Sequence, residues 1–324
     1  MRLELSAEHW ELNQPFTTAN GSCDHVDTLL LALGDGEFSG RGEAAGVDYH
    51  GETVDNMCAQ IEAVRSIIEA GIELPEVQNL LPPGGARNAL DCALWDLAAK
   101  RAGRRAWDLL GVAVRPLQTL YTIGLDRIPA MAAEATAHAD FPVLKVKVGL
   151  GDPLAQLAAV HRAAPKAGLV IDANQTWTME QLLAWTPALA ALGVAMIEQP
   201  LAVGEDEALR GYASPVPLCA DESCQVSADL PRLVGLHELV NIKLDKTGGL
   251  SEALRLATRA EELGLELMVG NMLGTSLAMA PAFLIAQRCR YVDLDGPLLQ
   301  REDRDPPMVY RRSWLNPPPA DLWG

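Results

Sequence analysis

From about residue 117 onward, short apolar runs alternate with longer amphipathic runs along the chain. The short runs have the length and the Val, Ile and Leu content of buried strands, whereas the longer runs have the apolar spacing of helices. Polar residues at the ends of the short runs recur about every 25 residues, which is typical of a repeated strand–helix unit. Eight such strands predict a β/α barrel, and we place them at 119–124, 143–149, 169–172, 194–198, 217–220, 239–244, 266–270 and 291–295.

The first hundred or so residues follow a different pattern. Residues 3–16 and 27–44 read as strands, and a Gly-Asp-Gly turn divides the second stretch. Helical patterns follow at 53–71 and 85–103. Strands that are followed by helices predict an α+β unit. Only seven helical runs fit between the eight barrel strands, and we expect the Pro-rich tail to return and pack on the N-terminal unit.

Composition narrows the range of partners and locations. The chain has 26 Lys and Arg against 43 Asp and Glu, a formal charge of −17, which argues against nucleic acid or an anionic membrane as a partner. No apolar run approaches the roughly 20 residues of a membrane span. The N-terminus has no apolar signal region, and the six cysteines show no metal-binding spacing. We therefore expect a soluble cytoplasmic protein with reduced thiols.

Acidic residues stand at the ends of three consecutive barrel strands. Asp172 ends one strand, Glu198 ends the next, and the third runs into Asp221 and Glu222. Because the carboxyl ends of barrel strands meet at one face, these groups should converge, and their charges would repel unless a cation lies between them. An all-oxygen ligand set favours Mg²⁺ first and Mn²⁺ second. Asn174 is a candidate for a polar contact to a substrate, with a plain turn residue as the alternative.

Lysines occupy two strands of the predicted barrel. Lys145 and Lys147 are two residues apart and so share one face of their strand. Four strands further on, we assign Lys243 to the inner face and place Lys246 where a loop gives way to a helix. Strands four apart in a ring of eight stand opposite one another. The sequence therefore predicts an ammonium group on each side of a metal.

This arrangement suits removal of a proton from a carbon next to a carboxylate. A divalent metal stabilises the enediolate that forms, and a lysine can act as the base if burial and neighbouring cations lower its pKa. Two lysines on opposite faces can remove a proton on one side and return one on the other. The expected result is racemisation or epimerisation, whereas a single productive lysine would instead favour elimination or cycloisomerisation.

Five stretches, in chain order, resemble the muconate-lactonising subgroup of the enolase superfamily: LKVKVG, DANQTW, IEQP, ADES and NIKLDKTGG. ARNALDCALWDLAAK resembles its N-terminal domain signature. The resemblance implies an α/β fold in which an α+β capping domain (1–115) covers a modified TIM barrel, (β/α)7β (116–300), with 301–324 returning to the cap. It also implies Mg²⁺ ligands and an acid/base pair, namely Asp172, Glu198 and Asp221 for the metal and Lys147 and Lys243 for proton transfer. Lys145, one layer deeper, is then expected to help hold the substrate carboxylate.

Asp293 and Asp295 narrow the choice within the subgroup, because they lie two apart on the last predicted strand. They resemble the paired carboxylates with which dipeptide epimerases hold the N-terminal ammonium of a dipeptide. Three stretches resemble the L-Ala-D/L-Glu epimerases, which act on peptides released from murein: LPPGGARNALDCALWDLAA, LGVAMIEQPL and VNIKLDKTGGL. The implied function is Mg²⁺-dependent epimerisation of a dipeptide at the α-carbon of its C-terminal residue, by two-base 1,1-proton transfer through an enediolate.

Other functions stay open at this point. N-acylamino acid racemase, o-succinylbenzoate synthase and cycloisomerase activities would use the same metal and lysines without the paired carboxylates. A non-catalytic barrel that binds metal or partners would leave the inward lysines unexplained. The family resemblance implies that the capping-domain loop at 16–25 closes over the substrate, and members that prefer glutamate usually carry a basic residue there. This loop has no Arg or Lys, so it suits a dipeptide whose second residue is neutral or basic at least as well as one that ends in glutamate. The sequence does not reveal the oligomeric state, and a homo-oligomer stays open because barrels of this family often associate.

Overall fold

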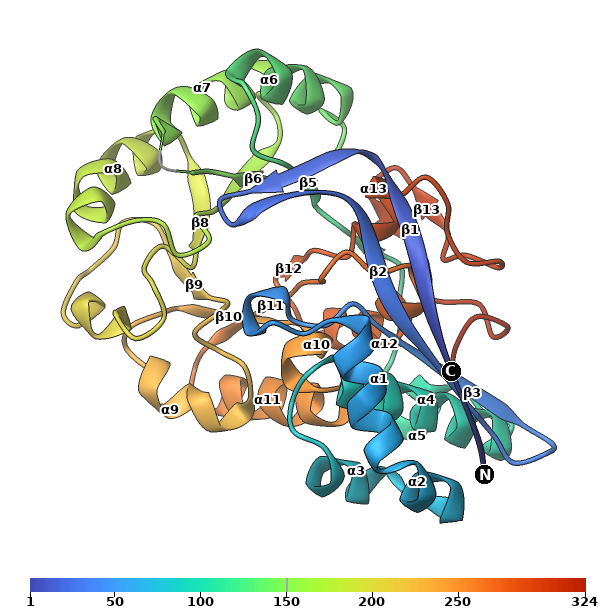
Figure 1. The fold of residues 1–324 in the computed structure, drawn as a ribbon. Coiled ribbons are helices and arrows are strands. Elements are labelled where there is room, and N and C mark those ends of the chain that lie inside the picture. Colours follow the sequence, from blue (N-terminus) through green and yellow to red (C-terminus); the bar gives the residue numbers. More distant parts are fainter. Residues whose placement is uncertain (150) are drawn as a thin grey trace.

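The computed structural model describes residues 1–149 and 151–324. Eight parallel strands form a ring in chain order, and the ring closes where the Leu120 N–H donates to the Val292 carbonyl at 2.8 Å (Figure 1). The strands are β5 (Tyr121–Ile123), β6 (Val143–Lys147), β7 (Gly168–Asp172), β8 (Val194–Glu198), β9 (Leu218–Ala220), β10 (Leu239–Ile242), β11 (Glu266–Val269) and β12 (Tyr291–Val292). The predicted barrel and its eight strands are confirmed, although several strands are shorter than predicted.

Helical segments cover the outside of the ring and form its connections. Leu144 and Val146 of β6 point outward and pack with Leu157 and Val160. The lysines that alternate with them, Lys145 and Lys147, therefore face inward, as predicted. Within the described residues, the link from β8 to β9 holds only a 3-10 helix, η2 (Asp206–Leu209). The other helices are α6 (Ile128–Ala137), α7 (Pro153–Ala163), α8 (Met179–Ala191), η3 (Ser227–Asp229), α9 (Leu230–Leu233), α10 (Leu244–Thr247), α11 (Leu250–Glu262), α12 (Ser276–Ala286) and α13 (Gly296–Leu299).

The N-terminal unit is an antiparallel three-stranded sheet with helices packed beside it. Its strands are β1 (Arg2–Thr18), β2 (Gly21–Gly34) and β3 (Ser39–Ala44). The predicted helix at 53–71 is broken at Val64 into two helices. The helical elements are η1 (Asp48–His50), α1 (Val54–Ala63), α2 (Arg65–Gly71), α3 (Leu74–Leu80), α4 (Gly85–Ala102) and α5 (Ala106–Leu110).

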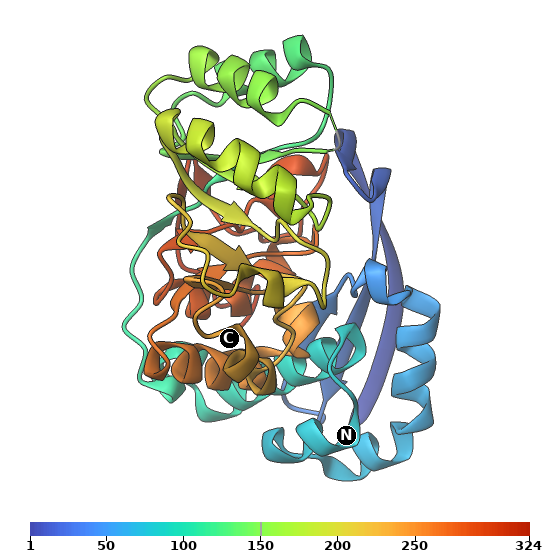
Figure 2. The same ribbon diagram turned by 90° about the vertical axis from the view of Figure 1, so that its left-hand side faces the viewer.

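The hairpin of β1 and β2 is the longest feature of the N-terminal unit. It runs along one side of the barrel (Figures 1 and 2), and near its tip the Thr17 carbonyl accepts a hydrogen bond at 2.8 Å from the Leu125 N–H, in the link from β5 to α6. The stretch 16–25, predicted as a loop, is mostly the end of this hairpin, since Phe16 pairs with Cys23 and Thr18 with Gly21. This segment is therefore ordered by strand pairing.

The C-terminal segment touches both units. Three short strands pair antiparallel beside the barrel, namely β13 (Tyr310–Arg311), β14 (Trp314–Leu315) and β4 (Leu117–Gln118). Beyond them, the Trp323 indole N–H donates to the Cys92 carbonyl at 3.0 Å, and the Gly324 N–H donates to Asp96 at 2.7 Å. The end of the chain thus lies against α4. The domain boundaries at 115 and 300 stay a prediction.

No helix within residues 1–149 and 151–324 is both long enough and apolar enough to cross a bilayer.

Strand β3 lies unusually close to α4, and two glycines make that approach possible. A Cβ added at Gly42 would lie 2.0 Å from the Ala89 carbonyl oxygen, and one at Gly40 would lie 2.2 Å from that of Ala93. These contacts are with backbone atoms, which cannot turn aside as a flexible side chain can. The close packing of the cap therefore depends on glycine at both positions.

We expect Gly42→Ala to lower the free energy of unfolding by about 1–3 kcal/mol, because the helix and strand must separate to make room for the methyl group. Urea unfolding measures the loss. Gly34→Ala is the matched control at the end of β2, since its Cβ would meet its nearest neighbour only at 3.8 Å. Equal effects of the two substitutions would contradict the close-packing argument.

Candidate active site

Three buried carboxylates meet at the carboxyl ends of neighbouring strands. The parallel register places Asp172 of β7 beside Glu198 of β8, and Asp221 follows β9 directly. One oxygen from each lies within 4.8 Å of the others, and all three residues are buried. The structure thus brings together the three residues that the sequence singled out for a metal.

The charges in this cluster fit a hard cation. Burial and the neighbouring Asp172 raise the pKa of Glu198 to about 8, even though Lys145 opposes the rise. Burial also raises the pKa of Asp172, but Lys147 and Lys145 outweigh it and bring that pKa to about 2. Oε2 of Glu198 is buried, and its charged neighbour is the Lys145 ammonium at 2.8 Å. Crowded carboxylate oxygens, with no nitrogen or sulfur donor among the three clustered residues, match the preferences of Mg²⁺.

Lys145 lies among the carboxylates. Its Nζ is 2.8 Å from Glu198 Oε2, 2.9 Å from Asp293 Oδ2 and 3.2 Å from Asp172 Oδ2. Burial lowers the pKa of Lys145, but Asp293, Glu198 and Asp172 outweigh burial and hold it well above the ordinary value. A lysine can act as a base at neutral pH only if its pKa falls, and here the carboxylates have the opposite effect. A divalent cation in the cluster would offset the charge that causes it.

Lys147 and Lys243 both line a cavity of about 380 Å³ below the β1–β2 hairpin. Lys147 Nζ is 2.7 Å from Asp172 Oδ2, and Lys243 Nζ is 2.7 Å from Asp221 Oδ2. The two ammonium groups therefore come from β6 and from the end of β10, with the carboxylate cluster between those strands in the ring. As with Lys145, burial lowers the pKa of Lys243, but Asp221 and other groups outweigh burial and raise it.

Asn174 lines the cavity, but it lies in a turn after β7 and not on the strand. β7 ends at Asp172, and Asn174 follows in a turn with a φ of 42°. Its Oδ1 accepts a hydrogen bond from Lys147 at 3.1 Å, and its Nδ2 donates to Glu222 at 3.4 Å. Glu222, which we did not select, also lines the cavity. Burial and the neighbouring Asp221 and Asp172 raise the pKa of Glu222 to about 7.

Lys246 is the clearest omission of the sequence analysis. We placed it where a loop gives way to a helix and gave it no role, but it is 1% exposed, and its Nζ is 2.6 Å from Asp221 Oδ1. It also donates to the Asn241 carbonyl at 2.9 Å. The predicted strand at 239–244 ends early, at Ile242, and α10 begins at Leu244. Residues three apart lie on the same side of a helix, so Lys243 and Lys246 both reach Asp221. We missed this spacing because we had assigned residues 239–244 to a strand.

Asp293 and Asp295 are both buried, but they follow β12 rather than forming part of it. Asp293 contacts Lys145, and Asp295 Oδ2 accepts a hydrogen bond from the Thr122 N–H at 2.6 Å. Burial and the neighbouring Asp293 raise the pKa of Asp295 to about 8. Asn271, which lines the cavity, donates to the Asp293 carbonyl at 2.8 Å. The two carboxyl groups are thus adjacent and connected to the cavity wall.

Comparisons with known proteins agree with this geometry. Residues 128–320 match the family model "Enolase C-terminal domain-like", and residues 1–111 match "Mandelate racemase / muconate lactonizing enzyme, N-terminal domain". The chain is 43% identical to an N-acetyl-D-glutamate racemase from Pseudoalteromonas, over 91% of this chain and 95% of the relative. It is 41% identical to the L-Ala-D/L-Glu epimerase of Escherichia coli K12, over 97% and 99%.

Two solved structures are similar over nearly the whole chain. One is an enolase family member from Agrobacterium tumefaciens with homology to dipeptide epimerases, holding sodium and L-Ala-L-Glu, at 45% identity, a TM-score of 0.97 and 99% coverage of both chains. The other is a dipeptide epimerase from Methylococcus capsulatus complexed with Mg and L-Arg-D-Lys, at 30% identity, a TM-score of 0.88 and coverage of 98% and 96%. By both domain matches and these relatives, the chain belongs to the mandelate racemase/muconate lactonizing enzyme group of the enolase superfamily.

Proposed function

We propose that this protein is a Mg²⁺-dependent isomerase that epimerises a dipeptide at the α-carbon of its C-terminal residue. The observation that carries the proposal is the pair of lysines, Lys147 and Lys243, which line one cavity from opposite parts of the barrel. A single base would need only one of them. The relatives named as epimerases and racemases support a reaction that inverts a carbon centre.

Asp172, Glu198 and Asp221 would hold the metal. When bound, Mg²⁺ supplies a Lewis acid that stabilises the negative charge on the substrate carboxylate as the neighbouring α-proton leaves. The three protein carboxylates fix the position of that charge by approaching from three adjacent strands. Lys145, which already contacts two of them, helps to hold the substrate carboxylate and is too deeply buried to serve as the first choice for proton transfer.

Proton transfer is assigned to Lys147 and Lys243. One lysine, as a neutral amine, removes the α-proton from its side of the substrate, and the other, as an ammonium group, delivers a proton from the far side. The configuration at the α-carbon is thereby inverted, and the roles exchange for the opposite stereoisomer. Asn174, which accepts a hydrogen bond from Lys147, orients that lysine and offers its amide to the substrate.

Asp293 and Asp295 provide the partner for the N-terminal ammonium of the dipeptide. A fixed pair of carboxyl groups can accept charge-assisted hydrogen bonds from such a group. Their distance from the metal cluster is set by Lys145, which contacts Asp293 and Glu198 at once. The substrate would thus be recognised by its two charged ends, with its ammonium group at the aspartate pair and its carboxylate at the metal.

We take a dipeptide like L-Ala-D/L-Glu as the leading substrate, because the 45% identical protein from Agrobacterium tumefaciens holds L-Ala-L-Glu. Among the described residues that line the cavity, Lys147 and Lys243 are the only Lys or Arg. The hairpin itself offers Asp24, His25 and Asp27 in place of a basic residue. Neutral and basic second side chains therefore belong in any substrate panel. A role in murein peptide metabolism, a cytoplasmic location and a homo-oligomeric state remain predictions.

A second candidate is racemisation of an N-acylamino acid, which the 43% identical N-acetyl-D-glutamate racemase favours. An N-acyl group carries no positive charge, so such a substrate would not need Asp293 and Asp295. The paired carboxyl groups are the reason that we rank the dipeptide first.

The two-base assignment predicts that each lysine serves one face. In D₂O, Lys147→Ala and Lys243→Ala should each lower epimerisation by about 10²–10⁴-fold, while each variant keeps α-proton exchange with a different stereoisomer. Mass spectrometry of the recovered dipeptides reads both quantities. Lys166→Ala, an exposed lysine beyond α7, is the control. If either variant exchanged both stereoisomers at the normal rate, the assignment would be wrong.

Asp295→Asn separates the two candidate substrates. Loss of a charge-assisted contact should lower dipeptide turnover by about 10- to 100-fold and leave racemisation of an N-acetylamino acid far less changed. Steady-state kinetics on L-Ala-L-Glu and N-acetyl-glutamate, side by side, make the comparison. Unaltered dipeptide turnover in this variant would favour the N-acylamino acid reading.

Metal removal should abolish turnover and weaken the fold together. Dialysis against EDTA should stop α-proton exchange, and Mg²⁺ should restore it. An ion present at 100 times its dissociation constant adds about 2.7 kcal/mol to the free energy of unfolding, so Mg²⁺ should also raise the melting temperature. Asp221→Asn should reduce that rise. Full exchange in protein shown by elemental analysis to be metal-free would refute the role of Mg²⁺.

A further inference from the structure

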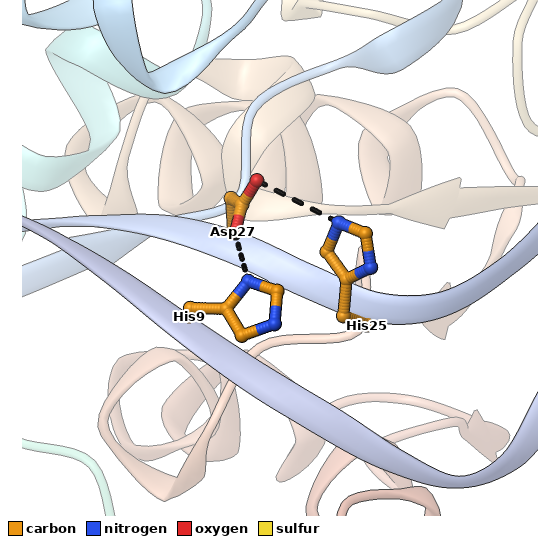
Figure 3. Close-up of side chains that lie close together, drawn as sticks. All are labelled: His9, His25 and Asp27. Atoms are coloured by element: carbon orange, nitrogen blue, oxygen red, sulfur yellow. Dashed lines mark hydrogen bonds and ion pairs between the residues drawn. The ribbon is translucent and has the colours of Figure 1, made fainter.

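A second cluster of metal-ligating side chains lies on the β1–β2 hairpin, apart from the carboxylate cluster. His9 of β1 is the direct cross-strand partner of Asp27 of β2, and His25 lies two residues before Asp27 on the same strand. Residues two apart on a strand share a face, and directly opposed residues are close. The three side chains therefore project from one face of the hairpin toward one another (Figure 3).

Asp27 stands between the two imidazoles. Its Oδ1 is 2.7 Å from His9 Nδ1, and its Oδ2 is 3.8 Å from His25 Nε2. One ligand atom from each of the three residues lies within 4.8 Å of the others, and the two ring centroids are 4.4 Å apart. A metal bound through these atoms would replace the hydrogen bond between His9 Nδ1 and Asp27, and that nitrogen would give up its proton on binding.

Asp24 prepares His25 for this role. Its Oδ1 is 2.7 Å from His25 Nδ1, and an ionised carboxylate can only accept a hydrogen bond. In neutral His25 the proton is therefore on Nδ1, and the lone pair of Nε2 is directed toward Asp27. A carboxylate that fixes the tautomer of a histidine from behind is the usual support of a histidine metal ligand.

We propose that the hairpin binds a transition-metal ion of the Zn²⁺ class through His9, His25 and Asp27. Two imidazoles and one carboxylate are a ligand set that zinc accepts with a fourth position left to water. The side chains are 44–57% exposed, so solvent can supply that fourth ligand. Glu11, opposite His25 in the register, is already paired with Arg301.

This site differs from the buried centre in the chemistry that it selects. Asp172, Glu198 and Asp221 offer oxygen alone, which suits Mg²⁺, whereas imidazole nitrogens favour zinc and its neighbours in the periodic table. The two sites are also connected, since His25 and Asp27 line the cavity that contains Lys147 and Lys243. An ion on the hairpin would tie β1 to β2 in the roof of that cavity.

The test is a metal titration of the full chain with the carboxylate site saturated by Mg²⁺. Calorimetry should show one further equivalent of Zn²⁺, and Co²⁺ should give the visible absorption of a low-symmetry site with nitrogen ligands. His9→Gln, His25→Gln and Asp27→Asn should each weaken Zn²⁺ binding by about 100-fold or more, because each removes one of three ligands. Asp24→Asn should weaken it by about 10-fold, since it removes only the supporting carboxylate. His161→Gln, on α7, is the matched control and should bind normally.

Circular dichroism establishes that each variant is folded. Histidine side-chain NMR of the unaltered protein gives an independent result, since Zn²⁺ should shift the ring signals of His9 and His25 and leave those of His161 in place. The absence of a Zn²⁺ equivalent beyond Mg²⁺ would overturn the proposal. So would equal weakening by His161→Gln, or ring shifts that spare His9 and His25. None of these readouts depends on catalysis, so the proposal stands or falls separately from the proposed function.

Discussion

The structure depends on concentrating negative charge in the centre of a barrel. Asp172, Glu198 and Asp221 are fully buried within a few ångströms of one another, where carboxylates are costly unless they are paired. The chain supplies the opposing charge with lysines from two opposite sectors of the ring. The unusual lysine pattern in FPVLKVKVG is explained by this constraint: Lys145 and Lys147 face the acidic centre, while Leu144, Val146 and Val148, which alternate with them, pack toward the helices.

The cap is the second half of the same arrangement. The barrel mouth alone would leave the lysines open to water, and the β1–β2 hairpin covers one side of it (Figure 2). Buried contacts hold the cap in place, among them Arg304, which pairs with Glu43 of β3 at 2.7 Å. On the barrel side, Asp245 of α10 accepts a hydrogen bond from the Gly46 N–H at 3.0 Å. The cap is therefore tied, just after β3, to the same short helix that carries Lys246.

Sequence periodicity predicted the parts of the site that lie on regular strands. A period of two predicts which face of a strand a residue occupies, and the end of the strand predicts how near the residue lies to the mouth of the barrel. These two rules were enough to select Lys145, Lys147, Asp172 and Glu198. Strand periodicity gave the wrong faces where a strand ended sooner than its apolar pattern suggested. The chain enters α10 two residues after Ile242, so Asp245 faces the cap and Lys246 pairs with Asp221. The strand pairing at the hairpin tip, where Thr18 pairs with Gly21, was also missed, because residues 16–25 are mostly polar and show no apolar alternation.

The environment of Asp221 shows how these omissions bear on mechanism. Its Oδ1 contacts Lys246, which is almost fully buried, while its Oδ2 contacts Lys243, which lines the cavity. Both lysines, together with Lys145, lower the pKa of Asp221 against the effect of burial. Lys246 can therefore balance the charge of Asp221 without leaving its place. On the proposed assignment of Lys243 as a proton-transfer residue, it can turn toward a substrate while the Lys246 ammonium still neutralises the buried Asp221. The second lysine, three residues further along the chain, would then keep the acidic centre balanced during proton transfer.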